Sequence, residues 1–271
     1  MIDTTVAASD FLITKEYQRF EEFCNACARD RYIGICYGSP GVGKTLSARY
    51  FSKQHLIDEF RKENYSTQAI TQMEEQVSSC RTLFYTVEVS NTPKRIEEDI
   101  NRQLREHRSF IARASLDILG RELTDNDRHE LIIIDEADRL KVNSLEQIRD
   151  IYDRKNIGIV LVGMQGMQKR LARYAQLYSR VGFAHEFRPL GKKEIYFVLE
   201  HFWRELGLTF DKNTPDIAET VALIVSATNG NFRLIVRIFG QMKRIMKLND
   251  LKIINKELVE AARDCLVIGS N

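Results

Sequence analysis

The stretch RYIGICYGSPGVGKTL, from Arg31 to Leu46, decides the fold. Its second half, Gly38-Ser-Pro-Gly-Val-Gly-Lys-Thr45, satisfies the pattern G-x-x-x-x-G-K-[ST] of a phosphate-binding loop at every fixed position. The glycines allow a turn in which successive backbone N–H groups point toward a polyphosphate. The apolar residues before the loop predict a buried parallel strand at 32–37, and those after it predict a helix at 46–57.

The polar residues of this loop have separate chemical tasks. Lys44 can reach the β- and γ-phosphates, Thr45 can offer its hydroxyl to Mg²⁺, and the following helix presents its positive N-terminal end to the anion. The pattern therefore predicts a nucleotide site. The residues expected to contact the nucleotide are Gly38, Ser39, Pro40, Gly41, Val42, Gly43, Lys44, Thr45 and Leu46.

The composition is that of an ordinary globular protein, with 44% apolar and 29% charged residues among 271. The formal charge of +2 favours neither nucleic acid nor an acidic partner. No apolar run is long enough to span a membrane, and the N-terminus lacks the pattern of a signal peptide, so we expect a cytoplasmic location. Five cysteines, with Cys24 and Cys27 as an isolated C-x-x-C, predict packed reduced thiols in preference to a zinc or redox site.

Alternating strand and helix patterns follow the loop. We expect further strands at 82–89, 131–134, 157–162 and 183–187, and helices at 16–29, 92–121, 144–154 and 166–177. Residues 61–80 are polar and weakly patterned, which indicates a surface insertion or a helix extension. This alternation predicts a mostly parallel five-stranded sheet with helices on both faces.

After Pro189 the pattern is helical throughout. Helices are expected at 191–206, 216–228, 231–247 and 255–266, with no strand among them. We therefore expect residues 1–190 to form an N-terminal arm and an α/β nucleotide-binding core, and residues 191–271 to form a small helical subdomain.

Two acids end the apolar run Leu131-Ile-Ile-Ile-Asp-Glu136. A strand that buries its apolar residues releases these acids at the carboxyl edge of the sheet, where α/β folds bind ligands. Asp135 can hold Mg²⁺ through water. Glu136 can orient and deprotonate an attacking water molecule.

The pair GSPGVGKT and LIIIDEAD resembles the AAA+ ATPases. The resemblance implies a P-loop core with an all-helical lid, and Mg²⁺-dependent hydrolysis of ATP to ADP and phosphate. It also implies three catalytic positions. Gln165 is the expected polar sensor, where the family more often has Asn, Thr or Ser. Arg180 is the expected arginine donated to the neighbouring subunit, with Arg173 as second choice, and Arg233 lies in the lid motif Gly230-Asn-Phe-Arg233. An arginine acting between subunits implies a ring or a helical filament.

Within that family, the chain is most similar to transposition regulators of the MuB, TnsC and TniB kind. This resemblance implies ATP-dependent assembly on double-stranded DNA with little sequence preference. It also implies a transposase as partner, with a target-site-selection protein as a further one. The expected DNA contacts are Lys94, Arg95 and Arg102, which would bind the phosphate backbone. Acids interleave with these cations, so a self-paired, solvated helix face is the competing interpretation.

Two other functions are open at this point. A helicase loader or replication initiator would share the same ATPase core but have a replicative partner. A nucleotide-switched adaptor would bind ATP as a conformational ligand and hydrolyse little of it.

Overall fold

A computed structural model describes residues 11–60, 76–119, 128–212 and 214–266. The chain divides into two compact units. The first contains residues 17–38 and 44–187, together with the N-terminal residues up to Ile13; the second contains residues 14–16, 39–43 and 188–271. The division at Phe187 and Arg188 lies close to the boundary expected at residue 190.

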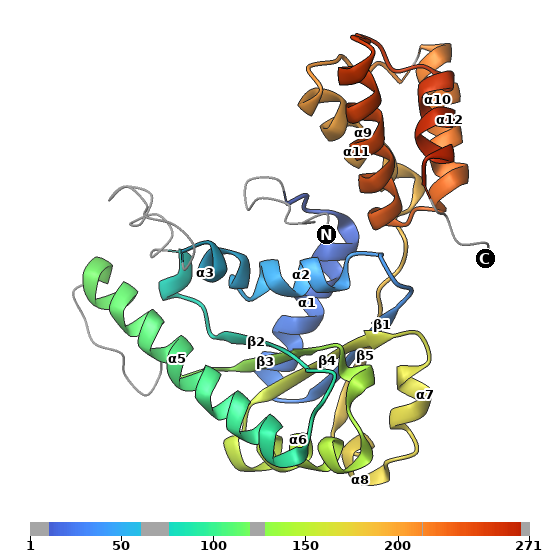
Figure 1. Ribbon diagram of the computed structural model, residues 1–271. Coiled ribbons are helices and arrows are strands. Elements are labelled where there is room, and N and C mark those ends of the chain that lie inside the picture. Colours follow the sequence, from blue (N-terminus) through green and yellow to red (C-terminus); the bar gives the residue numbers. More distant parts are fainter. Residues whose placement is uncertain (1–10, 61–75, 120–127, 213, 267–271) are drawn as a thin grey trace. The chain divides into compact units, whose positions relative to one another are not determined.

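A parallel five-stranded sheet organises the first unit (Figure 1). The strand order is β2-β3-β4-β1-β5, so β1 lies inside the sheet and β2 forms one edge. The central strands are buried on both faces, which explains their continuous apolar runs. The strands are β1 (Ile33–Gly38), β2 (Thr82–Thr86), β3 (Leu131–Asp135), β4 (Gly158–Met164) and β5 (Val181–Glu186).

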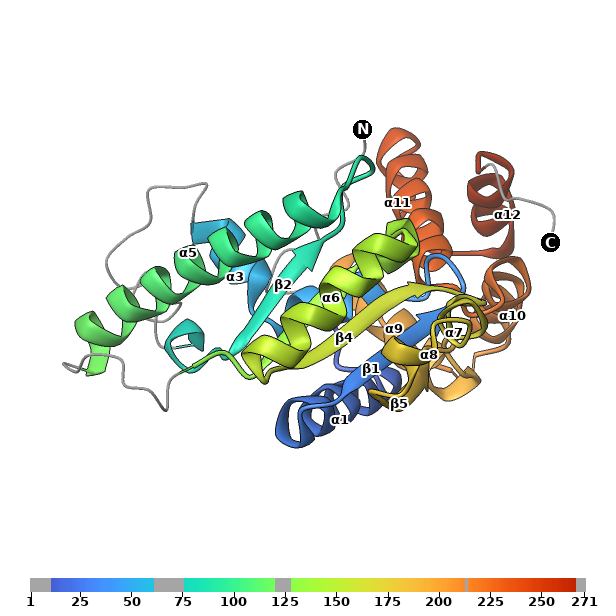
Figure 2. The same ribbon diagram turned by 90° about the horizontal axis from the view of Figure 1, so that it is seen from below.

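Helices α5 (Pro93–Leu119) and α6 (Val142–Lys155) cover one face of this sheet, as Figure 2 shows from that side. Ile96 and Ile148 are fully buried there, in one core with alternate residues of β1 to β4. The short helices α7 (Met167–Leu171) and α8 (Ala175–Tyr178) contribute Leu171 and Leu177 to the same core. The principal hydrophobic core therefore lies between α5, α6 and the sheet.

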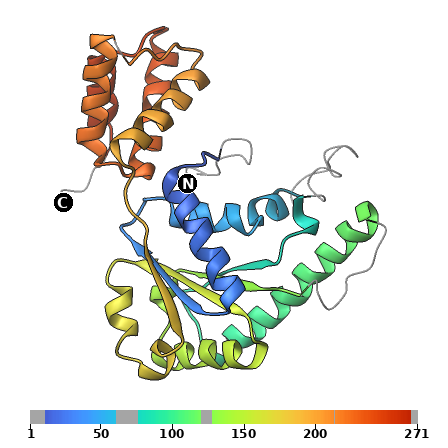
Figure 3. The same ribbon diagram turned by 180° about the vertical axis from the view of Figure 1, so that it is seen from behind.

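The opposite face carries α1 (Lys15–Asp30), which crosses the sheet in Figure 3. Its close approach depends on Gly34 in β1, because a Cβ there would lie 2.5 Å from Cys27 Sγ and 2.6 Å from the Phe23 ring. Cys24 and Cys27 are buried, as the sequence predicted, and neither forms a disulfide. Phe11 stacks on Tyr50 with ring centroids 3.9 Å apart, and residues 1–10 of the expected arm lie outside the described residues.

The second unit contains α9 (Lys192–Glu205), α10 (Pro215–Thr228), α11 (Phe232–Leu248) and α12 (Lys256–Asp264). Trp203 is 2% exposed and packs against Phe239 with ring centroids 5.2 Å apart. Asn229 and Gly230 have positive φ and end α10, and Asn231 then caps α11 by accepting a hydrogen bond from the Leu234 N–H. These turn residues fix where each helix of this unit begins and ends.

Two helices differ from the sequence prediction. The helix expected at 46–57 is divided into α2 (Lys44–Phe51) and α3 (Gln54–Phe60), since Lys53 has φ 55° and the Ser52 hydroxyl donates to the Ala48 carbonyl. The helix expected at 166–177 is divided into α7 and α8. Leu171 and Leu177 would lie about 120° apart around one continuous helix, and the break lets both enter the core.

Of the predicted surface insertion at 61–80, residues 61–75 lie outside the described residues. In the described part of the chain, no helix combines the length and apolarity needed to cross a bilayer.

Candidate functional site

The phosphate loop connects the end of β1 to the start of α2. Gly41 has φ 81° and Gly43 has φ 117°, conformations that side-chain-bearing residues rarely adopt. At Gly38 the constraint is space, because a Cβ would lie 2.2 Å from the Phe187 carbonyl oxygen. The loop therefore requires all three glycines, two for their backbone angles and one for a close approach.

Lys44 and Thr45 begin α2 and direct polar groups toward the carboxyl edge of the sheet. Lys44 Nζ donates to the Gly38 carbonyl at 2.8 Å, so the ammonium lies over the start of the loop. Thr45 Oγ1 donates to Asp135 Oδ2 at 2.9 Å, joining the first turn of α2 to the last residue of β3. Residues about 90 positions apart in the chain are thus brought together.

Asp135 is a buried carboxylate with 4% exposure. Burial raises the pKa of Asp135 above its usual value, while hydrogen bonds from Thr45 and from the Glu136 backbone oppose that rise. A buried carboxylate is stabilised by a nearby cation, and Mg²⁺ prefers oxygen ligands, taking one or two from a protein and others from phosphates and water. The Thr45 hydroxyl and the Asp135 carboxylate fit that donor set.

Glu136 has an unusual backbone conformation, with φ 57° and ψ 36°. This left-handed conformation is rare for a residue with a long side chain and is typical of functional sites. Its carboxylate lies 3.5 Å from Arg139 Nη2, and its side chain is 45% exposed. Arg139 is anchored in turn by a 2.7 Å hydrogen bond to the Val87 carbonyl. Glu136 is therefore accessible to water and is oriented by an arginine three residues later.

In the second unit, α11 begins beside residues 40 and 41 of the loop. The Arg233 N–H donates to the Gly41 carbonyl at 2.9 Å, and Asn231 Nδ2 donates to the Pro40 carbonyl at 2.8 Å. A Cβ on Gly41 would lie 2.6 Å from Asn231 Oδ1. The lid motif is thus held to the loop by the Arg233 backbone and the Asn231 side chain, and the Arg233 side chain makes neither contact; Arg233 is exposed.

Arg180 lies immediately before β5 and forms a two-pronged ion pair with Asp153, at 2.7 Å and 2.9 Å. Its side chain is 30% exposed. Gln165 follows β4 directly and is exposed, as is Arg173 between α7 and α8. The roles expected for Gln165, Arg180 and Arg233 remain predictions.

The cations expected to bind DNA lie on the first turns of α5, and each pairs with an acid. Lys94 lies 3.8 Å from Glu98, Arg95 lies 2.6 Å from Glu88, and Arg102 lies 2.7 Å from Asp99. All three side chains are more than half exposed. Both interpretations of this face, a DNA contact and a self-paired surface, are compatible with the geometry.

Known proteins resemble this chain in the segment that contains the site. The family described as "AAA domain" matches residues 28–171, which include the phosphate loop, Asp135 and Glu136. The chain belongs to the AAA domain family. This AAA domain protein is 43% identical to a "Potential ATP-binding protein" of Staphylococcus aureus, over 96% of the chain and 97% of the relative.

Two further likenesses confirm the expected resemblance and fold. The chain is 30% identical to the "ATP-dependent target DNA activator B" of Escherichia phage Mu, over 55% of the chain and 42% of that relative. It therefore matches less than half the length of the phage protein. The RuvB Holliday junction branch migration motor of Thermotoga maritima has the same fold, with a TM-score of 0.60, 15% identity, and 96% of this chain and 72% of that one covered.

Sequence reasoning missed several residues that support the AAA domain site. Asp138 accepts a 2.6 Å hydrogen bond from the Met164 N–H and so joins the ends of β3 and β4. Arg170 donates to the carbonyls of Ala137 and Asp138. Asp138 is the third acid of LIIIDEAD, so the sequence carried a signal for its contact. The contacts of Arg170 had no local signal, because they join residues more than thirty positions apart.

Proposed function

We propose that this AAA domain protein is a Mg²⁺-dependent ATPase that assembles on double-stranded DNA and recruits or activates a transposase. The observation that carries the proposal is the 2.9 Å contact between Thr45 and Asp135, beside Lys44 and the water-accessible Glu136. The likeness to a phage protein described as an ATP-dependent target DNA activator supports the DNA and transposition part.

The site residues divide the chemistry among them. When bound with Mg²⁺, ATP supplies the phosphoanhydride bond that is hydrolysed. Lys44 and the loop N–H groups bind its phosphates, and Thr45 and Asp135 hold the metal directly or through water. Glu136 accepts a proton from the attacking water. This step requires that Arg139 orients the Glu136 carboxylate and that the carboxylate remains negatively charged. Arg180 completes the site of a neighbouring copy, which makes hydrolysis depend on assembly.

Nucleotide-dependent binding to a fluorescein-labelled duplex tests this function. We expect the fluorescence anisotropy to rise with ATP or a slowly hydrolysed analogue, and to stay low with ADP or no nucleotide. Glu136→Gln is expected to retain the DNA-bound state after ATP addition, because nucleotide binding survives while proton removal is lost. Glu146→Gln, the same change on the exposed surface of α6, is the matched control and should behave as the wild type. Equal DNA binding with ATP, ADP and no nucleotide would refute the proposal.

One observation favours a nucleotide-switched adaptor as the second candidate. The carboxylate of Glu136, the expected base, lies 3.5 Å from Arg139 Nη2 and is engaged in an ion pair with it. In such an adaptor Glu136→Gln should change neither the lifetime of the DNA complex nor the rate of phosphate release. In the ATPase it should abolish release and lengthen the lifetime.

A further inference from the structure

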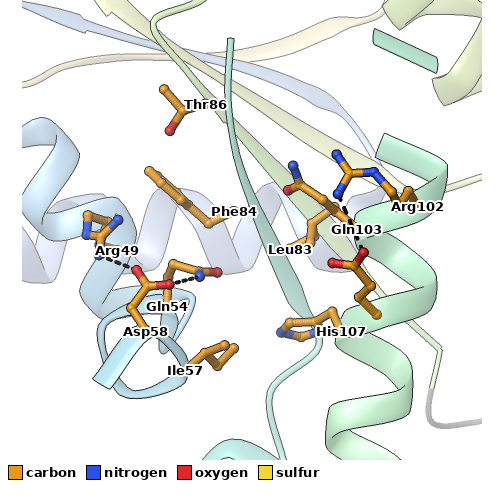
Figure 4. Close-up of a pocket in the computed structure, with 11 residues that line it drawn as sticks. Arg49, Gln54, Ile57, Asp58, Leu83, Phe84, Thr86, Arg102, Gln103 and His107 are labelled. Carbon is orange, nitrogen blue, oxygen red and sulfur yellow. Dashed lines mark hydrogen bonds and ion pairs between the residues drawn. The ribbon is translucent and has the colours of Figure 1, made fainter. Parts of the chain in front are cut away.

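A pocket of about 310 Å³ lies at the β2 edge of the sheet, on the far side of β2 from β3 (Figure 4). Its walls come from the two helical layers that enclose the sheet. Arg49, Gln54 and Asp58 from α2 and α3 lie on one side of β2, and Arg102, Gln103 and His107 from α5 lie on the other. The pocket therefore occupies the place of the next strand in the sheet.

The backbone of β2 offers hydrogen-bonding groups to this space. The Val87 N–H donates to the Asp135 carbonyl and the Arg81 carbonyl accepts from the Glu130 N–H, so the odd-numbered residues of this segment face β3. In a parallel ladder, alternate residues direct their N–H and C=O groups to opposite edges. Phe84 and Thr86 consequently direct theirs outward, and no described residue hydrogen-bonds to those groups.

Apart from Ile57 on α3, the side chains of both walls are polar, and their charges balance. The Arg49 guanidinium lies over the Phe84 ring at 5.7 Å and pairs with Asp58, which also accepts a 2.8 Å bond from Gln54. On the α5 side, Arg102 pairs with Glu106 at 3.5 Å. Because each arginine already has a carboxylate partner, the pocket favours neither an isolated anion nor a cation. An uncharged ligand with alternating donors and acceptors matches it better, and an extended peptide backbone has that character.

We propose that this pocket is a slot for an extended segment of a partner protein, which adds to β2 as a sixth strand. Its main chain hydrogen-bonds to the N–H and C=O groups of Phe84 and Thr86, and its alternate side chains, polar and together uncharged, contact the two walls. These two outward residues span only about 7 Å of strand, so the affinity is modest and the side-chain contacts provide much of the selectivity. The slot uses no residue of the phosphate site, and it shares Arg102 with the DNA contacts expected for the function proposed above.

Thr86→Pro tests the backbone contact directly. Proline removes the outward N–H of an exposed residue at the end of an edge strand, a position that tolerates proline, and removes no hydrogen bond to β3. Thr86→Val is the matched control, since it keeps the N–H and the branched shape. The probe is a random decapeptide library displayed on phage, selected on the wild-type protein, and the best peptide is then synthesised with a fluorophore for anisotropy.

We expect this peptide to bind the wild type and Thr86→Val equally, to bind Thr86→Pro at least tenfold more weakly, and to slow amide hydrogen exchange at Phe84 and Thr86. Binding should not change with ATP. Gln103→Trp, which fills the slot from α5, should also weaken binding at least tenfold and serves if Thr86→Pro does not fold.

Three results would overturn the proposal: no peptide recovered, equal binding to all variants, or exchange protection away from β2. If the protein alone sediments as a dimer that Thr86→Pro dissociates, the slot takes a second copy of this chain and the partner peptide is ruled out.

Discussion

Thr45→Val removes the hydroxyl that joins α2 to β3 while keeping nearly the same shape. Hydrogen bonds to charged groups contribute about 1.5–3 kcal/mol, and the exposure of Thr45 lets water replace part of the lost contact. We therefore expect a loss of about 1.5 kcal/mol in the free energy of unfolding without nucleotide, which lowers Tm by about 3–6 °C for a chain of this size. Thr45→Ser, which keeps the hydroxyl, should lose under about 0.5 kcal/mol.

A double-mutant cycle with Asp135→Asn isolates the contact. In the Asp135→Asn background the bond to Thr45 joins two neutral groups, so Thr45→Val should cost only about half as much. Urea unfolding followed by circular dichroism, without nucleotide, measures all four proteins. The reasoning fails if Thr45→Val leaves stability unchanged, or if its cost is the same in both backgrounds. With ATP and Mg²⁺ present, Thr45→Val should also lose the stabilisation that the metal-bound nucleotide gives the wild type.

Further predictions address the other charged groups. Lys44→Ala should abolish the thermal shift given by ATP, which at a hundred times the dissociation constant corresponds to about 2.7 kcal/mol in the wild type; an unchanged shift would contradict the assigned role. Arg180→Ala should eliminate ATP hydrolysis but keep ATP binding, and because its ion pair with Asp153 is exposed to water it should change stability little. Burial lowers the pKa of His129 to about 4, so the unfolded chain binds the proton more tightly and stability should fall as pH drops from 6.5 toward 4, by up to about 3 kcal/mol; His129→Gln should flatten that slope in urea titrations at several pH values. Lys94→Ala and Arg95→Ala should each weaken DNA binding and reduce the slope of log K against log salt by about 1, whereas Arg204→Ala in the helical unit should not; unchanged slopes would favour the self-paired surface.

The parts of the fold that the sequence predicts well are those with strong local signals. The phosphate loop, the buried run Leu131–Ile134 and the patterns of the last four helices all depend on residues within a few positions of one another. Because α/β connections are regular, the order of these elements was enough to predict a parallel sheet and the meeting of Thr45 with Asp135 at its carboxyl edge.

Contacts between distant residues could not be predicted in the same way. Nothing local indicates that Arg180 pairs with Asp153, or that Asn231 reaches the Pro40 carbonyl, because both depend on where whole elements pack. The break at Ser52 and Lys53 is of another kind: a helical pattern continues through it, and only the positive φ of Lys53 and the bond from Ser52 to Ala48 divide the helix. The left-handed conformation of Glu136 likewise has no signal in the sequence, because residues with a long side chain rarely adopt it.

The central claim is that a triphosphate binds between the start of α2 and the acids that end β3. An electron-microscopy map of the protein with duplex DNA, Mg²⁺ and a slowly hydrolysed ATP analogue tests it most directly. The account predicts Lys44 at the β- and γ-phosphates, Thr45 and Asp135 around the metal, and Arg180 of one copy at the nucleotide of the next. A map with nucleotide elsewhere, or with Asp135 and Glu136 turned away from it, would contradict the account.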